Sequence, residues 1–153
     1  MRSSTGTILR TTRGIVSFRS LWTGEQFAAP GYRFRSLEAP LDLSAAIYAA
    51  TTGTVPDCFF TDEDMALLLI ETNAPVMEAI RMVSAVLPTQ PPTTEIAPGY
   101  EVPDYVEHVS NWAATAPVFA DQPPTTAEVI DVLERAADTA DNLAGTHPVR
   151  SAA

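Results

Sequence analysis

The chain has 153 residues, of which 46% are hydrophobic and 18% are charged, and its formal net charge is −10. This length and composition are typical of a single globular domain with a sizeable core, and they exclude wholesale disorder. The negative charge excludes nucleic acid as the partner of most of the surface, because phosphate binding needs a basic footprint.

The first 37 residues form a basic region. They hold six arginines against one acid, Glu25, a balance of +5, whereas residues 38–153 hold three arginines against the other 18 of the chain's 19 acids, a balance of −15. Residues 15–22 are rich in β-branched and aromatic side chains, and residues 32–37 alternate apolar and basic ones. This pattern predicts a small N-terminal β-hairpin or extended arm, with a helix over residues 7–13 as the competing prediction.

Helix signals dominate from residue 40 onward. Asp42 and Gly53 stand at the two ends of an Ala-rich segment, where an acidic cap and a left-handed stop are favoured. Thr61 and Asp64 have the spacing of a capping box ahead of a second short helix over residues 65–71.

Three further helices and a linker complete the chain. Asn73 caps a predicted helix that runs to residue 87, and the proline-rich residues 88–103 are predicted to form a linker. A helix is predicted over residues 104–114, and the last begins at Thr125, whose capping box precedes a long apolar stripe.

These elements predict a mainly α protein. We expect about five amphipathic helices in one compact domain, with the small β-hairpin or extended arm at the N-terminus. The charge map divides the chain into a basic arm over residues 1–37, an acidic helical domain over residues 38–143, and a disordered tail over residues 144–153.

One pair of residues has the spacing for catalysis. Asp104 and His108 are four residues apart on a predicted helix, so the carboxylate and the imidazole can share a proton or two positions on a metal ion. Catalysis would need a third group from elsewhere in the fold. The competing interpretation is a histidine at the edge of a packed helix, hydrogen-bonded to a neighbour. No metal-ligand spacing or cofactor motif is present, so we expect neither a metal nor a cofactor.

The N-terminal region offers the chain's candidate binding residues. Arginines interleaved with aromatic side chains can bind anions or a nucleic-acid strand. The candidates are Arg10, Arg13, Arg19, Trp22, Arg33 and Arg35. In the competing interpretation these arginines contact the protein's own acidic helices instead.

Four segments together are similar to a known family. They are residues 41–53, 79–87, 102–115 and 123–137, and the most specific parts are Asn111-Trp112 and the Thr-Ala-Glu-Val sequence that begins the last helix. Over about residues 40–138 the chain resembles an uncharacterised family of small actinobacterial proteins, of the Streptomyces type, whose function is unknown. The resemblance implies no activity and no catalytic residues.

The sequence therefore favours a non-enzymatic binding or regulatory module that acts through protein–protein contacts, with another protein or a second copy as partner. The alternatives are a small hydrolase that uses Asp104 and His108, and anion or nucleic-acid binding through residues 1–37. Cys58 is the sole cysteine, which favours a reducing cytoplasm. No apolar run approaches the roughly 18 residues of a transmembrane segment.

Overall fold

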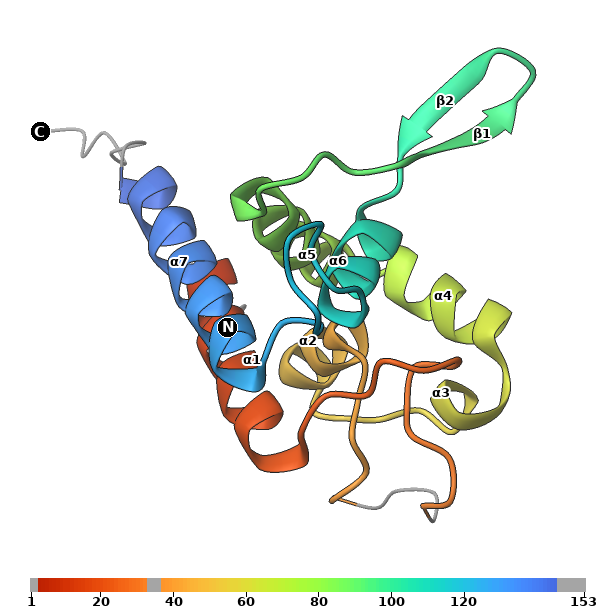
Figure 1. The fold of residues 1–153 in the computed structure, drawn as a ribbon, viewed down its shortest axis with the longest axis vertical. Coiled ribbons are helices and arrows are strands. Elements are labelled where there is room, and N and C mark those ends of the chain that lie inside the picture. Colours follow the sequence, from red (N-terminus) through yellow and green to blue (C-terminus); the bar gives the residue numbers. More distant parts are fainter. Residues whose placement is uncertain (1–2, 33–36, 146–153) are drawn as a thin grey trace, which may run out of the picture.

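The computed structural model describes residues 3–32 and 37–145, and in these ranges it contains seven helices and one two-stranded sheet (Figure 1). In chain order the elements are α1 (Thr5–Arg19), α2 (Leu43–Thr52), α3 (Cys58–Thr61), α4 (Glu63–Glu71), α5 (Ala74–Val86), β1 (Thr93–Ala97), β2 (Tyr100–Pro103), α6 (Tyr105–Ala114) and α7 (Thr126–Gly145). The prediction of a mainly α protein is confirmed, but the predicted details, about five helices and an N-terminal hairpin, are wrong. Of the predicted tail, residues 144 and 145 end α7, and residues 146–153 lie outside the described residues.

The N-terminal region is a helix, so the β-hairpin predicted there is wrong. Residues 15–19, assigned to a strand, form the last turns of α1. Ile8, Leu9, Thr12 and Val16 lie on one buried face of this helix, and their burial outweighs the β-propensity of the segment. The competing prediction of a helix is confirmed, although α1 is longer than expected. Residues 33–36 of the predicted second strand lie outside the described residues.

Helix α1 packs side by side with α7, and the two run antiparallel (Figure 1). Arg10 lies 3.0 Å from Asp138 and 2.8 Å from Asp141, measured between side-chain nitrogen and oxygen atoms. Arg13, further along α1, pairs with Glu134, which is nearer the start of α7. The first and last helices of the described chain are thus joined by both apolar packing and ion pairs.

Helix α5 lies at the centre of the helical body. It contacts α1, α2, α4, α6 and α7. Its buried side chains Val76, Ala79, Ile80 and Val83 recur at helical spacing and have no exposed surface. One apolar core therefore extends through all the long helices.

The loop between α1 and α2 is held against α3. The backbone N–H groups of Phe27 and Ala28 both donate to the carbonyl oxygen of Phe59, at 3.2 and 3.1 Å. The ring of Phe59 is fully buried, with ring-centroid distances of 5.8 Å to Phe27 and 5.2 Å to Tyr48. Although α3 is only four residues long, it anchors this loop through the backbone carbonyl and the ring of one residue, Phe59.

The sheet is a β-hairpin that projects away from the helices (Figure 1). Strands β1 and β2 pair antiparallel, with a register shift between Glu95 and Ala97. The turn contains Pro98 and Gly99, and the φ of 78° at Gly99 is a value that glycine adopts without strain. The prediction of a linker over residues 88–103 is therefore wrong for its second half, because Pro98-Gly99 closes a turn between two strands.

The helix starts agree with the predicted caps, with one exception. The side chains of Asp42, Asn73 and Thr125 accept hydrogen bonds from N–H groups in the first turns of their helices. At α4 the cap is Asp62, which accepts from a backbone N–H at 3.1 Å, and not Thr61. Thr61 is the last residue of α3, so its backbone is helical and unsuited to an N-cap.

Candidate functional site

An acidic pocket of about 400 Å³ opens between the loop at residues 23–27, the start of α4, and α6. Carboxyl groups line it, from Glu25, Asp42, Glu63, Asp104 and Glu107. No arginine is among the described residues that line it. The pocket therefore has a negative potential that attracts cations and repels anions.

Asp42 forms the buried wall of this acidic pocket and is only 8% exposed. Its Oδ2 accepts hydrogen bonds from the N–H of Ser44 at 2.8 Å and from the hydroxyl of Ser110 at 3.0 Å. Burial raises the pKa of Asp42 to about 6, and the hydrogen bonds from Ser110 and the backbone only partly oppose this. A carboxyl with such a pKa exchanges its proton near neutral pH.

His108 is a buried residue whose two ring nitrogens are both occupied. Only 4% of its surface is exposed. Its Nδ1 lies 2.7 Å from the hydroxyl of Ser84, and its Nε2 lies 2.7 Å from the hydroxyl of Thr89. One neutral tautomer satisfies both contacts, because hydroxyl groups donate or accept. Burial lowers the pKa of His108, so the imidazole is held neutral.

Asp104 is the N-cap of α6, and its side chain does not bond to the His108 ring. Its Oδ1 accepts from the N–H of Glu107 at 2.9 Å, and its Oδ2 accepts from the hydroxyl of Thr94 at 3.1 Å. The bond between the two predicted partners is the helical one, from the His108 N–H to the Asp104 carbonyl at 3.1 Å. This geometry gives no support to proton sharing between their side chains.

We expect the His108→Gln variant to lose about 1–2 kcal/mol of unfolding free energy at pH 7.5, because it retains only part of the hydrogen bonding. The pKa of His108 is lower in the folded protein, so the wild type loses stability as pH falls through and below 6.5. The deficit of the variant should therefore shrink at pH 5. Urea unfolding at both values measures it, and a deficit that grows in acid would contradict the structure.

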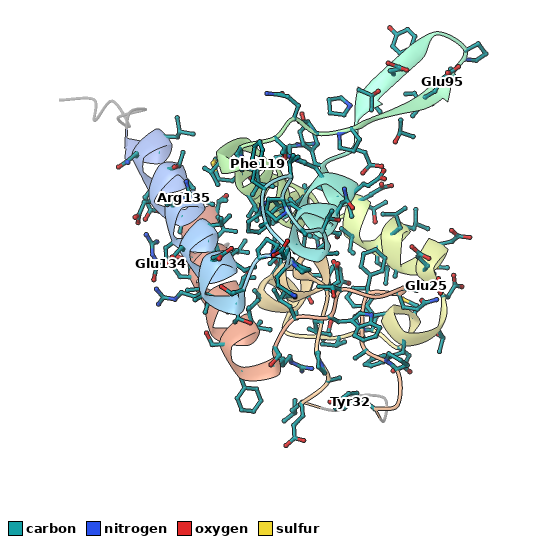
Figure 2. All side chains as sticks on the ribbon, viewed as in Figure 1. Glu25, Tyr32, Glu95, Phe119, Glu134 and Arg135 are labelled. Carbon is teal, nitrogen blue, oxygen red and sulfur yellow. The ribbon has the colours of Figure 1, made fainter. Side chains whose placement is uncertain are left out.

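Two of the six predicted binding residues, Arg10 and Arg13, face acids of α7. Their partners are the carboxylates of Asp138, Asp141 and Glu134, the last labelled in Figure 2. The hydrogen bond that Arg10 donates to Asp141, and then the contacts and charges of both aspartates, raise the pKa of Arg10. A phosphate group would therefore compete with these carboxylates for either arginine.

Two of the other four predicted binding residues, Arg19 and Trp22, donate hydrogen bonds to backbone carbonyl groups. Arg19 donates to a backbone carbonyl at 3.2 Å, and burial lowers its pKa. The indole N–H of Trp22 donates to a backbone carbonyl at 2.8 Å. Arg33 and Arg35 lie outside the described residues. Among the four candidates that the structure describes, Arg10 and Arg13 therefore lie together opposite the acids of α7.

The projecting hairpin exposes large apolar side chains. Ile96 is 64% exposed and Tyr100 is 70% exposed. A groove of about 370 Å³ lies at the base of the hairpin, where β1 and β2 approach the end of α4, the first turns of α5 and the start of α6. Figure 2 shows Glu95 on the outer part of the hairpin, away from the helical body. We call this feature the hairpin groove.

Within residues 3–32 and 37–145, no group of three or more His, Cys, Asp or Glu side chains is arranged to hold a metal ion. In the same ranges no helix combines the length and the apolar character needed to cross a membrane. Two pockets of the described chain, the acidic pocket and the hairpin groove, are lined by carboxylates and by no arginine.

Residues 1–139 match the model of a family of unknown function, DUF6197. The chain belongs to this family. The predicted resemblance to a family of unknown function is thereby confirmed, and the DUF6197 match also covers the N-terminal residues that contain α1. No curated protein and no solved structure matches the chain.

Sequence reasoning missed both the acidic pocket and the hairpin of this DUF6197 member. The hairpin has a usable signal, since residues 93–97 and 100–103 flank a Pro-Gly pair that favours a turn. The contact between Asp42 and Ser110 leaves no signal in the sequence, because the two residues are 68 positions apart and the position of Asp42 predicts only a helix cap. Only the packing of α2 against α6 brings them together.

Proposed function

We propose that this protein is a non-enzymatic binding or regulatory module that acts through protein–protein contacts, and that the projecting hairpin is its main contact surface. The observation that supports the proposal is the exposure of Ile96 and Tyr100 on a hairpin whose first strand is exposed at every residue. Large apolar side chains gathered on a projecting element are typical of protein interaction sites. A strand exposed at every residue contributes little to the core.

Two observations favour this role over the alternatives. Asp104 and His108, the pair of the hydrolase alternative, each bond to other side chains. Arg10 and Arg13, from the anion-binding alternative, already contact carboxylates of α7. On the hairpin, by contrast, the large apolar side chains of Ile96 and Tyr100 remain mostly exposed.

We place this role in the cytoplasm of an actinobacterium. The sole cysteine, Cys58, is not in a disulfide, which suits a reducing compartment. Nine arginines and no lysine suit a GC-rich genome. Fractionation of host cells, followed by detection of the protein with a specific antibody, tests the location.

The double variant Ile96→Ser, Tyr100→Ser tests the proposed contact surface. Both side chains are mostly exposed, so the substitutions should change the unfolding free energy by no more than about 0.5 kcal/mol each. Removing two apolar anchors from an interface should weaken it by about tenfold or more. Chemical cross-linking in host cells, followed by quantitative mass spectrometry of the recovered complexes, measures the loss.

The matched control is Phe18→Ser on α1. Phe18 is 72% exposed and belongs to α1, which lies away from the hairpin (Figure 1), so its loss removes a similar apolar surface elsewhere. We expect the control to recover the same partners as the wild type. Equal recovery by the hairpin variant, or no cross-linked partner for the wild type, would refute the proposal.

A further inference from the structure

The hairpin groove combines apolar side chains from two parts of the chain. Met77 of α5 and Tyr105 of α6 line it on the helical side, and Ile96 and Val102 line it on the hairpin side. Thr94 pairs with Val102 in the antiparallel register, and both line the groove together with Ile96. The hairpin therefore turns one apolar face toward the groove.

The charge of the hairpin groove is negative. Glu71 and Asp104 line it, and Glu101 lies on the neighbouring strand. Burial, followed by the charge of Asp104, raises the pKa of Glu71, so a positive group beside these carboxylates would be favoured. Among the described residues no arginine lines the groove. The arginine beside it is Arg81, whose guanidinium lies 5.6 Å from the centroid of the ring of Tyr105, a residue of the groove lining.

The hairpin also has backbone groups available for pairing. Its sheet has two strands, so each strand has one outer edge without a neighbouring strand in the described parts of the chain. An extended peptide can add to such an edge through backbone hydrogen bonds, while its alternate side chains enter an adjacent groove. A ligand that complements the hairpin groove therefore has three features. Its extended backbone pairs with the strand edge, an apolar side chain contacts the apolar face, and a positive charge lies beside the carboxylates.

We propose that the hairpin groove binds an extended segment of another protein in which an apolar side chain is flanked by arginine or lysine. The apolar side chain packs between Ile96 and Met77, and the cation pairs with Glu71. This inference rests on the proposed protein-binding function and specifies the partner of the same surface.

A second copy of the chain is disfavoured as the occupant. Pairing two hairpins edge to edge would bring Glu95 and Glu101 of each copy close to those of the other. Like charges that face each other across an interface weaken association, and each chain has a formal net charge of −10. The negative charge of the hairpin groove thus favours a basic partner over a second copy of the chain.

A pair of synthetic peptides tests the proposal. The first is an acetylated, amidated hexapeptide of alternating arginine and valine with a fluorescent label, and the second has glutamate in place of arginine. Fluorescence anisotropy with the full chain at 50 mM NaCl should show binding of the first only, weakened at 300 mM NaCl because charge contributes. Equal binding of the two peptides would overturn the proposal.

Two variants locate the binding. Glu71→Gln should weaken binding of the arginine peptide by about threefold to tenfold, and Ile96→Ser should weaken it by about tenfold. The matched controls are Glu63→Gln and Met65→Ser, which remove a charge and an exposed apolar side chain of α4 outside the hairpin groove. Because Glu63 lines the acidic pocket, its variant also tests binding there. Weakening by the controls equal to that by Glu71→Gln and Ile96→Ser would overturn the proposal.

The experiments separate this inference from the proposed function. If the hairpin double variant loses its cross-linked partners while Glu71→Gln leaves peptide binding unchanged, the protein-binding role stands and the hairpin groove inference is wrong. If sedimentation shows a dimer that Ile96→Ser dissociates, the occupant is a second copy and the inference is again wrong. Failure of both the cross-linking and the peptide experiments refutes both.

Discussion

The Asp42→Asn variant should be more stable than the wild type at pH 7.5, by as much as about 3 kcal/mol. Burial raises the pKa of Asp42 from 3.8 to about 6, and each unit of difference between the folded and unfolded chain corresponds to about 1.4 kcal/mol. Asparagine keeps the shape and the oxygen that caps α2 but removes the buried charge.

The gain should depend on pH in a defined direction. The folded wild type binds the Asp42 proton more tightly than the unfolded chain, so its stability falls as pH rises from about 4 to about 7. Asparagine does not titrate, so the difference between the two proteins should shrink by more than half at pH 4.5. Urea unfolding at the two pH values gives this difference, in which effects of His108 and the other titrating groups cancel.

The control for this comparison is Asp62→Asn. Asp62 makes an equivalent capping bond at the start of α4 but is exposed to solvent. Its substitution should change the unfolding free energy by less than about 0.5 kcal/mol. A loss of stability in Asp42→Asn at pH 7.5 would show that the hydrogen bonds from Ser44 and Ser110 outweigh the burial of the charge.

The Phe59→Ala variant should lose about 3–5 kcal/mol of stability, the largest effect expected of any single substitution considered. Phe59 is fully buried, and truncating such a ring removes its transfer free energy and leaves a cavity between Phe27 and Tyr48. For a chain of this size the loss corresponds to a fall in melting temperature of about 6–20 °C. Thermal unfolding followed by circular dichroism measures it.

The same substitution should loosen the loop that forms one wall of the acidic pocket. The N–H groups of Phe27 and Ala28 donate to the carbonyl oxygen of Phe59, so their hydrogen exchange should accelerate in the variant. Phe18→Ala, which removes an exposed ring, should leave both the stability and the exchange of these amides unchanged. A Phe59→Ala protein within about 1 kcal/mol of the wild type would contradict the packing of α3.

The helices that the sequence predicts well are those with a cap and a continuous apolar stripe. Helix α7 has both, since Thr125 accepts from the N–H of Glu128 and the stripe from Val129 to Ala140 is buried. Helix α1 has a weaker pattern, because Thr12 occupies a core position and Gly6 and Gly14 lower the helix propensity of the segment. Its β-branched and aromatic residues therefore predicted a strand, whereas the burial of its apolar face makes the segment a helix.

The candidate site was the part least accessible to sequence reasoning. The spacing of Asp104 and His108 correctly puts both at the start of one helix, but a capping side chain points to the N–H groups of the first turn and away from residue 108. The acidic pocket takes its walls from α2, α4, α6 and the loop at residues 23–27. Periodicity along one segment carries no information about such an assembly.

During synthesis on the ribosome, α1 emerges more than a hundred residues before α7, its main neighbour in the finished fold. The apolar face of α1 that α7 covers thus remains without that cover until nearly the whole chain has been translated. Contacts between segments so far apart in the sequence form slowly. Apolar helices that stay exposed in incomplete nascent chains are substrates for chaperones. Nascent chains stalled before α7 should therefore bind chaperones more strongly than completed ones.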